Sequence, residues 1–265
     1  MRDLMIIVGV GFVFGAGACG KASPPVTGGA TVPAATATSQ VAGGADAGTG
    51  TGTVAGAGGA ATKEDPSEAF RVVLEKGRGA FKGAQRERFE ILSQAEELKF
   101  DEAHKAQADA FKALKKTLEE FSIGESPAEL ATAPKRVCAL IEDVRVGAQK
   151  LVDDGNVEIK SLDDQQKELE AKQKEGGKVS QATWDKLDNA KQVVSVPVLA
   201  ARHIFLALRT ILNESLTLVE LGPRQTHVEF KECLGAIAKD PISFELTQGQ
   251  LTKVLERVNY FTSLE

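Results

Sequence analysis

Apolar side chains recur along most of the chain with the three- and four-residue spacing of helices that bury one face. The spacing is clearest from Val137 to Leu151, where apolar residues follow the i, i+3, i+4, i+7 pattern. No stretch shows sustained alternation of apolar and polar residues with β-branched enrichment. We therefore predict an all-α helical bundle. Its helices are expected over residues 66–99, 102–122, 133–154, 160–175, 180–221, 226–238 and 248–263, and three glycines favour a break in the first: Gly77, Gly79 and Gly83.

Residue types that start and end helices agree with these ranges. Three pairs have the spacing of a capping box, which starts a helix: Ser126 with Glu129, Thr226 with Glu229, and Thr247 with Gln250. Asp101 is expected to cap the next helix and to leave His104 exposed in its first turn. Four glycines stand where helix C-termini favour a left-handed residue: Gly124, Gly155, Gly176 and Gly222.

The segment of residues 156–192 differs from the rest because it is highly charged and has few large apolar side chains. Glu175, Lys178 and the two glycines between them favour a turn, so we expect a projecting antiparallel helical hairpin with a thin apolar seam. The only tryptophan, Trp184, lies on this seam. Local packing is the usual role of such a residue. Together with Glu175 and Lys178, it is nevertheless the first candidate for a partner-binding surface.

The N-terminal quarter has a different composition. Residues 1–18 include an apolar stretch, from Leu4 to Phe14, of a length typical of a signal peptide. Residues 19–62 are, after the cysteine that opens them, low-complexity Gly, Ala, Thr, Ser and Pro. Such a composition buries too little apolar area to offset chain entropy, so a disordered tether is expected. Residues 63–265 then form one helical domain.

Small residues precede the first cysteine, because Ala16, Gly17 and Ala18 stand directly before Cys19. This arrangement resembles the lipobox of bacterial lipoproteins, although Ala16 stands where leucine is usual. The resemblance covers the leader alone. It implies that Cys19 is lipidated and anchors the protein to a membrane of the bacterial cell envelope, and Gly20, in place of an aspartate, points to the outer membrane. Ordinary cleavage after Ala18 is the alternative, since the same residues fit the A-x-A rule.

Charge and motifs exclude several function classes. The formal net charge is −5 without a basic block, which argues against a nucleic-acid partner. The three histidines, His104, His203 and His227, form neither an H-E-x-x-H nor a Glu-x-x-His pair, and no C-x-x-C-H haem motif occurs. We therefore predict no metal, no cofactor and no enzymatic activity.

Two cysteines remain if Cys19 is lipidated. Cys138 and Cys233 both lie on or beside apolar helix faces. In an exported protein two such residues favour a disulfide, which would tie the helix of residues 133–154 to that of residues 226–238. Two buried free thiols are the alternative.

These observations leave two functional hypotheses. The first is an envelope lipoprotein whose helical domain binds a protein partner or acts as a scaffold. The second is a bundle that binds a small anionic molecule, with Arg202, His203 and Arg209 lining an internal pocket. The two arginines are seven residues apart on the most apolar helix, and buried arginines require anionic partners. Acidic residues on a neighbouring helix would satisfy them equally well.

Overall fold

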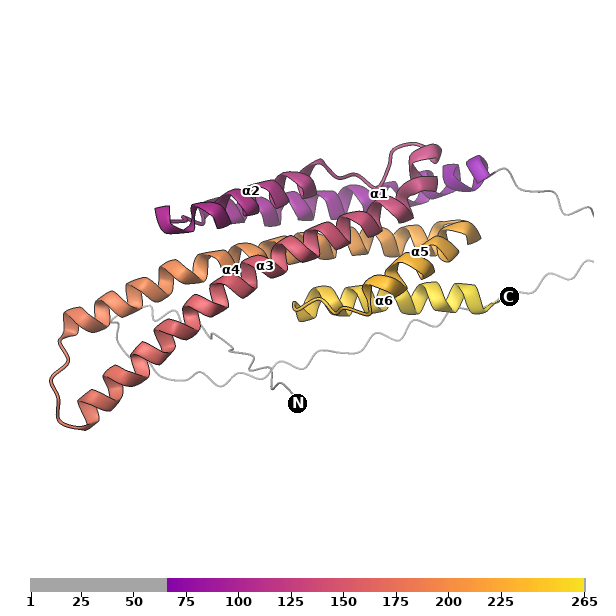
Figure 1. Cartoon of the computed structure of the whole chain (residues 1–265). Coiled ribbons are helices and arrows are strands. Elements are labelled where there is room, and N and C mark those ends of the chain that lie inside the picture. The colour runs from indigo at the N-terminus through magenta and orange to yellow at the C-terminus, as the bar shows by residue number, and fades with distance from the viewer. Residues whose placement is uncertain (1–65, 265) are drawn as a thin grey trace, which may run out of the picture. The chain divides into compact units, whose positions relative to one another are not determined.

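The computed structural model describes residues 66–264, which form a bundle of six α-helices and two short 3₁₀ turns (Figure 1). The expected signal peptide, Cys19 and the expected tether lie outside the described residues. Within the described part of the chain there is no strand, so the all-α prediction is confirmed. The elements are α1 (Pro66–Gln94), η1 (Ala95–Glu97), η2 (Glu102–His104), α2 (Lys105–Glu120), α3 (Pro127–Lys174), α4 (Gln181–Leu221), α5 (Arg224–Ile237) and α6 (Glu245–Ser263).

Helix α4 is the centre of the bundle, and α1, α2, α3 and α6 all pack against it. Its C-terminal half is apolar nearly all round, and Ile204, Leu208 and Ile211 are completely buried. Among the described helices it alone is long and apolar enough to cross a membrane. However, 56% of its most apolar window is buried among the other helices, as in the core helix of a globular bundle.

Helix α3 begins at Pro127, six residues before the predicted range of 133–154, and continues further than that range. Ser126 and Glu129 form the predicted capping box, with the Glu129 carboxylate accepting from the Ser126 N–H at 3.0 Å. The predicted end of this helix near Gly155 is wrong, because α3 is continuous to Lys174. Gly155 is buried against α4, where an added Cβ would lie 2.5 Å from Cγ2 of Val198. The glycine therefore allows two helices to approach closely and does not form a turn.

The other predicted helix ends have mixed outcomes. The Asp101 carboxylate accepts a hydrogen bond from the His104 N–H at 3.0 Å, which confirms it as a cap. The expected break in α1 is wrong, since α1 is one helix. Among the glycines, Gly176 follows the end of α3 with a φ of 85°, as predicted. Gly124 has a φ of 140° but lies in the loop after α2, which ends at Glu120, and Gly222 ends α4 with a φ of −83°.

The capping boxes predicted for α5 and α6 are also wrong. Helix α5 begins directly after Pro223, and α6 begins after Phe244, in each case upstream of the predicted cap. Thr226 and Thr247 are buried inside their helices. The hydroxyl of Thr247 donates to the carbonyl of Phe205 on α4 at 2.7 Å, so it joins two helices and caps neither.

Beyond Gly155, α3 and the first part of α4 continue as an antiparallel pair that extends past the other helices (Figure 1). We call residues 156–192 the arm and the rest of the described residues the body. The arm contains one buried residue, Leu187, whereas the core of the body draws side chains from every α-helix. The predicted projecting hairpin is confirmed, except that its first helix is the end of α3 and not a separate helix.

The two cysteines of the body lie together. The sulfur atoms of Cys138 on α3 and Cys233 on α5 are 2.05 Å apart, which is disulfide distance, and the Cα atoms are 6.0 Å apart. The predicted pairing is therefore confirmed. It closes a loop of 95 residues and ties α5 to α3.

Candidate functional site

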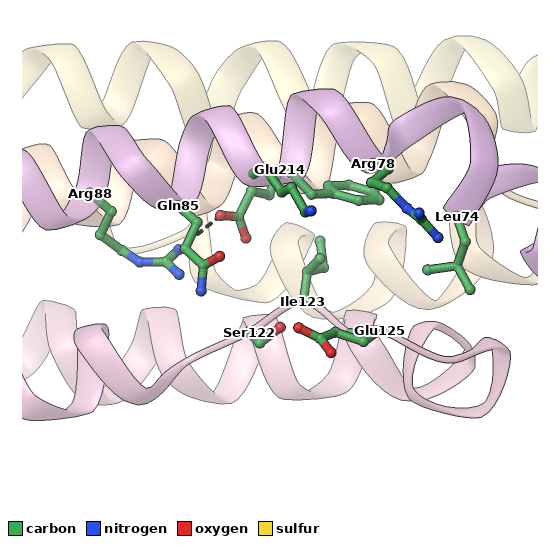
Figure 2. Close-up of a pocket in the computed structure, with 11 residues that line it drawn as sticks. Leu74, Arg78, Gln85, Arg88, Ser122, Ile123, Glu125 and Glu214 are labelled. Atoms are coloured by element: carbon green, nitrogen blue, oxygen red, sulfur yellow. Dashed lines mark hydrogen bonds and ion pairs between the residues drawn. The ribbon is translucent and has the colours of Figure 1, made fainter.

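An open pocket of about 270 Å³ lies between α1 and the loop that joins α2 to α3. Figure 2 shows side chains of α1 along one wall and the loop residues Ser122, Ile123 and Glu125 along the other. Glu214 of α4 points between the two walls and forms the floor. The pocket therefore brings together three segments that are far apart in the sequence.

The floor of the pocket is a buried ion pair. Nη1 of Arg88 donates to Oε1 of Glu214 at 3.0 Å, and the two side chains are 0% and 2% exposed. Burial raises the pKa of Glu214 to about 7, against the attraction of Arg88, and burial lowers the pKa of Arg88. Each charge is therefore kept in the core by its partner, at a large desolvation cost.

The loop beside the pocket is fixed from two sides. Nη2 of Arg88 donates to the carbonyl of Phe121 at 2.7 Å. From α3, Arg136 donates to the carbonyl of Ile123 at 2.6 Å, and its guanidinium lies 5.9 Å from the centre of the Phe121 ring. Gly124 turns the chain with a φ of 140°, which residues other than glycine rarely adopt. The pocket wall is therefore preformed.

The residues predicted as a partner surface lie on the arm. Glu175 and Lys178 flank the turn at its tip, where every residue from 171 to 178 is exposed. Trp184 is half-buried on α4, closer to the body. The arm therefore presents a charged tip and a partly covered tryptophan, and the tip carries no apolar patch.

The three residues predicted to hold an anion do not line this pocket. Arg202 is exposed and Arg209 is half-buried, and neither forms an ion pair with a residue that the structure describes. His203 is half-buried near the backbone of Ile91 on α1, and its Nδ1 is buried without a hydrogen-bond partner among the described residues. Burial lowers the pKa of His203, so the neutral ring packs between two helices.

The expected exposure of His104 is wrong. Its side chain is 6% exposed, because the ring lies between two carboxylates. Nδ1 contacts Asp101 of its own turn, and Nε2 lies 2.8 Å from Oε2 of Glu158, in the first turn of the arm. Burial opposes the charge, but the hydrogen bonds to Asp101 and Glu158 raise the pKa of His104 above its ordinary value. The imidazolium therefore links the start of α2 to the base of the arm.

Residues 66–264 contain no group of three His, Cys, Asp or Glu side chains that could hold a metal ion. No protein-family model, curated protein or solved structure matches the chain significantly. Three features of the fold therefore bear on function: a disulfide-linked helical body, a preformed pocket on one side of it and an arm that projects from it.

Neither residue of the buried ion pair is predicted above as a site residue, although the sequence contains a signal for each. Arg88 stands seven residues after Phe81 and four before Leu92, on the apolar stripe of α1. Glu214 lies four residues before Leu218, in the corresponding stripe of α4. A charge within an apolar stripe predicts a buried charge, and two opposite ones predict a pair. Which helices face each other is a tertiary fact that the stripes do not contain.

Proposed function

We propose that the protein is a lipid-anchored adaptor of the bacterial cell envelope, in which the body positions the arm and the arm binds a protein partner. The observation that supports this role most directly is the contrast in burial between the two regions. The body has a complete core, whereas the arm extends past it with one buried side chain. Such a helical pair adds little to the stability of the fold, and its exposed surface is available for binding.

The charge of the arm indicates the kind of partner. Over its whole length it has eight acidic and seven basic residues, but the tip is basic. Lys172, Lys174 and Lys178 surround the single acidic residue of residues 172–178, Glu175, and all four are exposed. Complementary charge steers association and selects partners. A protein with an acidic surface is therefore the partner that this tip favours.

Site-specific photocrosslinking tests this role in the cell. A photoreactive residue at Lys178 should capture a partner, and the same residue at Lys253, which is exposed on α6 of the body, should not. The partner identified in this way is then purified and its affinity measured. Equal capture from both positions, or from neither, would contradict a binding role of the arm.

Charge reversal supplies a matched control for that experiment. Changing Lys172, Lys174 and Lys178 to glutamate should weaken binding of the captured partner at least ten-fold. The same reversal at three exposed lysines of the body should leave the affinity within two-fold of wild type: Lys112, Lys135 and Lys253. Circular dichroism checks that both triple variants keep their helicity.

The anchor is supported by the residues of the leader, which resemble a lipobox, and has its own test. Labelling with a palmitate analogue should modify the wild-type protein and fail for Cys19→Ser, which should leave the membrane fraction. Ordinary cleavage after Ala18 predicts instead that both forms are unlabelled and soluble.

A further inference from the structure

Neither the proposed arm nor the proposed anchor accounts for the pocket beside α1. Its floor brings no net charge when Glu214 is ionised, because Arg88 and the Glu214 carboxylate then neutralise each other. One polar atom of the floor, Nε of Arg88, is buried without a hydrogen-bond partner among the described residues. The charge that a ligand meets is therefore decided at the rim of the pocket.

The rim has two cations from α1. Arg78 and Lys82 are four residues apart and so lie on one face of the helix, and both line the pocket. Both are exposed, and neither forms an ion pair with a described residue. The single anion of the rim is Glu125 on the opposite wall. The rim therefore has a surplus of positive charge.

Other arginines of the same helix behave differently. Arg71 pairs with Glu68 at 2.9 Å, and Arg86 pairs with Glu90 at 2.9 Å, both within α1. Glu75 stands three residues before Arg78, the same spacing as Glu68 before Arg71, but Arg78 forms no ion pair with a described residue. Lys82 has no acidic residue three or four positions away on either side. This difference along one helix favours an anionic ligand at the rim.

The remaining wall is apolar. Phe81 is 9% exposed and Ile123 is 2% exposed, and both line the pocket with Leu74. Apolar walls with a few polar groups are typical of small-molecule sites, and the volume of about 270 Å³ suits a molecule the size of a substituted benzene ring. A purely inorganic anion would leave this wall without a contact.

We propose that the pocket binds a small organic carboxylate, with its apolar body against Phe81 and Ile123 and its carboxylate at Arg78 and Lys82. Gln85, one helical turn further along α1, faces the same space and supplies an amide donor (Figure 2). The loop that carries Ile123 is already fixed, so binding needs no rearrangement of the wall. This site is independent of the arm.

Three fluorinated probes of nearly equal size test the proposal on the full chain by ¹⁹F NMR. They are 4-fluorophenylacetate, 2-(4-fluorophenyl)ethanol and 2-(4-fluorophenyl)ethylamine, which differ in charge. The acetate should bind with a Kd of about 0.1–1 mM, as expected for a ligand of this size, and at least ten-fold more tightly than the other two. Inorganic phosphate at the same concentration should not displace it. Binding of the amine or the alcohol as tightly as the acetate, displacement by phosphate, or no binding of the acetate at about 5 mM would overturn the proposal.

Two double variants locate the site. Arg78→Gln with Lys82→Gln removes the rim cations and should weaken binding of 4-fluorophenylacetate at least ten-fold. Lys76→Gln with Arg86→Gln makes the same charge change on the same helix, outside the pocket, and should leave the Kd within two-fold of wild type. All four side chains are exposed, so both variants should fold. Equal Kd values for the two variants would overturn the assignment of the carboxylate to Arg78 and Lys82.

Discussion

The body and the arm are built from the same helices but are stabilised differently. In the body, α3 and α4 carry residues such as Val144 and Ile204 that are 0% exposed and touch several other helices. In the arm, the same two helices pack mainly against each other, apart from the contact of Glu158 with His104 at its base, and Leu187 is the one side chain they bury. Helix formation by itself is marginal, so tertiary burial decides stability. The comparison therefore separates a region that determines the fold from one that is free to bind.

The strongest test of this difference compares how much one ion pair of the body and one of the arm contribute to stability, and the pair of the body should contribute far more. In the body, Arg88→Met leaves the carboxylate of Glu214 buried without its partner, and we expect a loss of about 3–5 kcal/mol in the free energy of unfolding. Urea denaturation measures it. The double variant Arg88→Met with Glu214→Leu should recover most of the loss, and a double variant as unstable as the single one would contradict the account.

The junction of body and arm should respond to a single methyl group. Gly155→Ala places a Cβ 2.5 Å from Val198, so the helices must separate, and the expected loss is about 1–3 kcal/mol. Gly79→Ala is the matched control on α1, because nothing lies within 4 Å of its added Cβ. That change should be neutral or stabilising by up to about 1 kcal/mol. Thermal unfolding of both variants measures the contrast, and equal melting temperatures would argue against close packing at Gly155.

Gly155 and Thr247 show what can and cannot be predicted from the sequence. Apolar spacing predicts the helices, the high charge of residues 156–192 predicts the arm, and two cysteines in an exported protein predict the disulfide. Each of these depends on residue type and position along the chain. Gly155 was predicted as a helix end because a glycine that ends a helix and one that admits a neighbouring helix have the same sequence signature. Thr247 is predicted as a cap from its spacing to Gln250, and the sequence does not show that its actual partner is the carbonyl of Phe205, 42 residues away. The pocket was missed for the same reason, since its walls come from segments that meet only in the fold.

The ion pair of the arm should matter far less than that of the body. Nζ of Lys191 lies 2.6 Å from Oδ1 of Asp163 across the arm, but the side chains are 26% and 44% exposed. Pairs open to water contribute about 0–1 kcal/mol, so Lys191→Met should change the stability by less than about 1 kcal/mol in urea denaturation. A loss as large as that of Arg88→Met would show that the arm is part of the cooperative core.

The link between His104 and Glu158 predicts a small pH dependence at the base of the arm. The pKa of His104 is raised in the folded state, so its contribution is fully present below the unfolded pKa of about 6.5 and is lost as the pH rises through the higher folded value. The difference in unfolding free energy between wild type and His104→Gln should therefore shrink as the pH rises above about 6.5. A difference that grows with pH would contradict the charged state assigned to His104.

The central claim is that the arm serves binding and that the body folds without it. The carbonyl oxygen of Val194 lies 3.5 Å from the position that a Cβ added to Gly155 would take. The two ends of the arm are therefore close together, so a short turn can replace residues 156–192. The most direct measurement compares this trimmed protein with the full chain in two respects, its thermal unfolding and its affinity for the partner captured through Lys178. We expect the trimmed protein to unfold in a cooperative transition within a few degrees of wild type and to show no detectable binding. An unfolded trimmed protein, or one that binds the partner as tightly as the full chain, would contradict it.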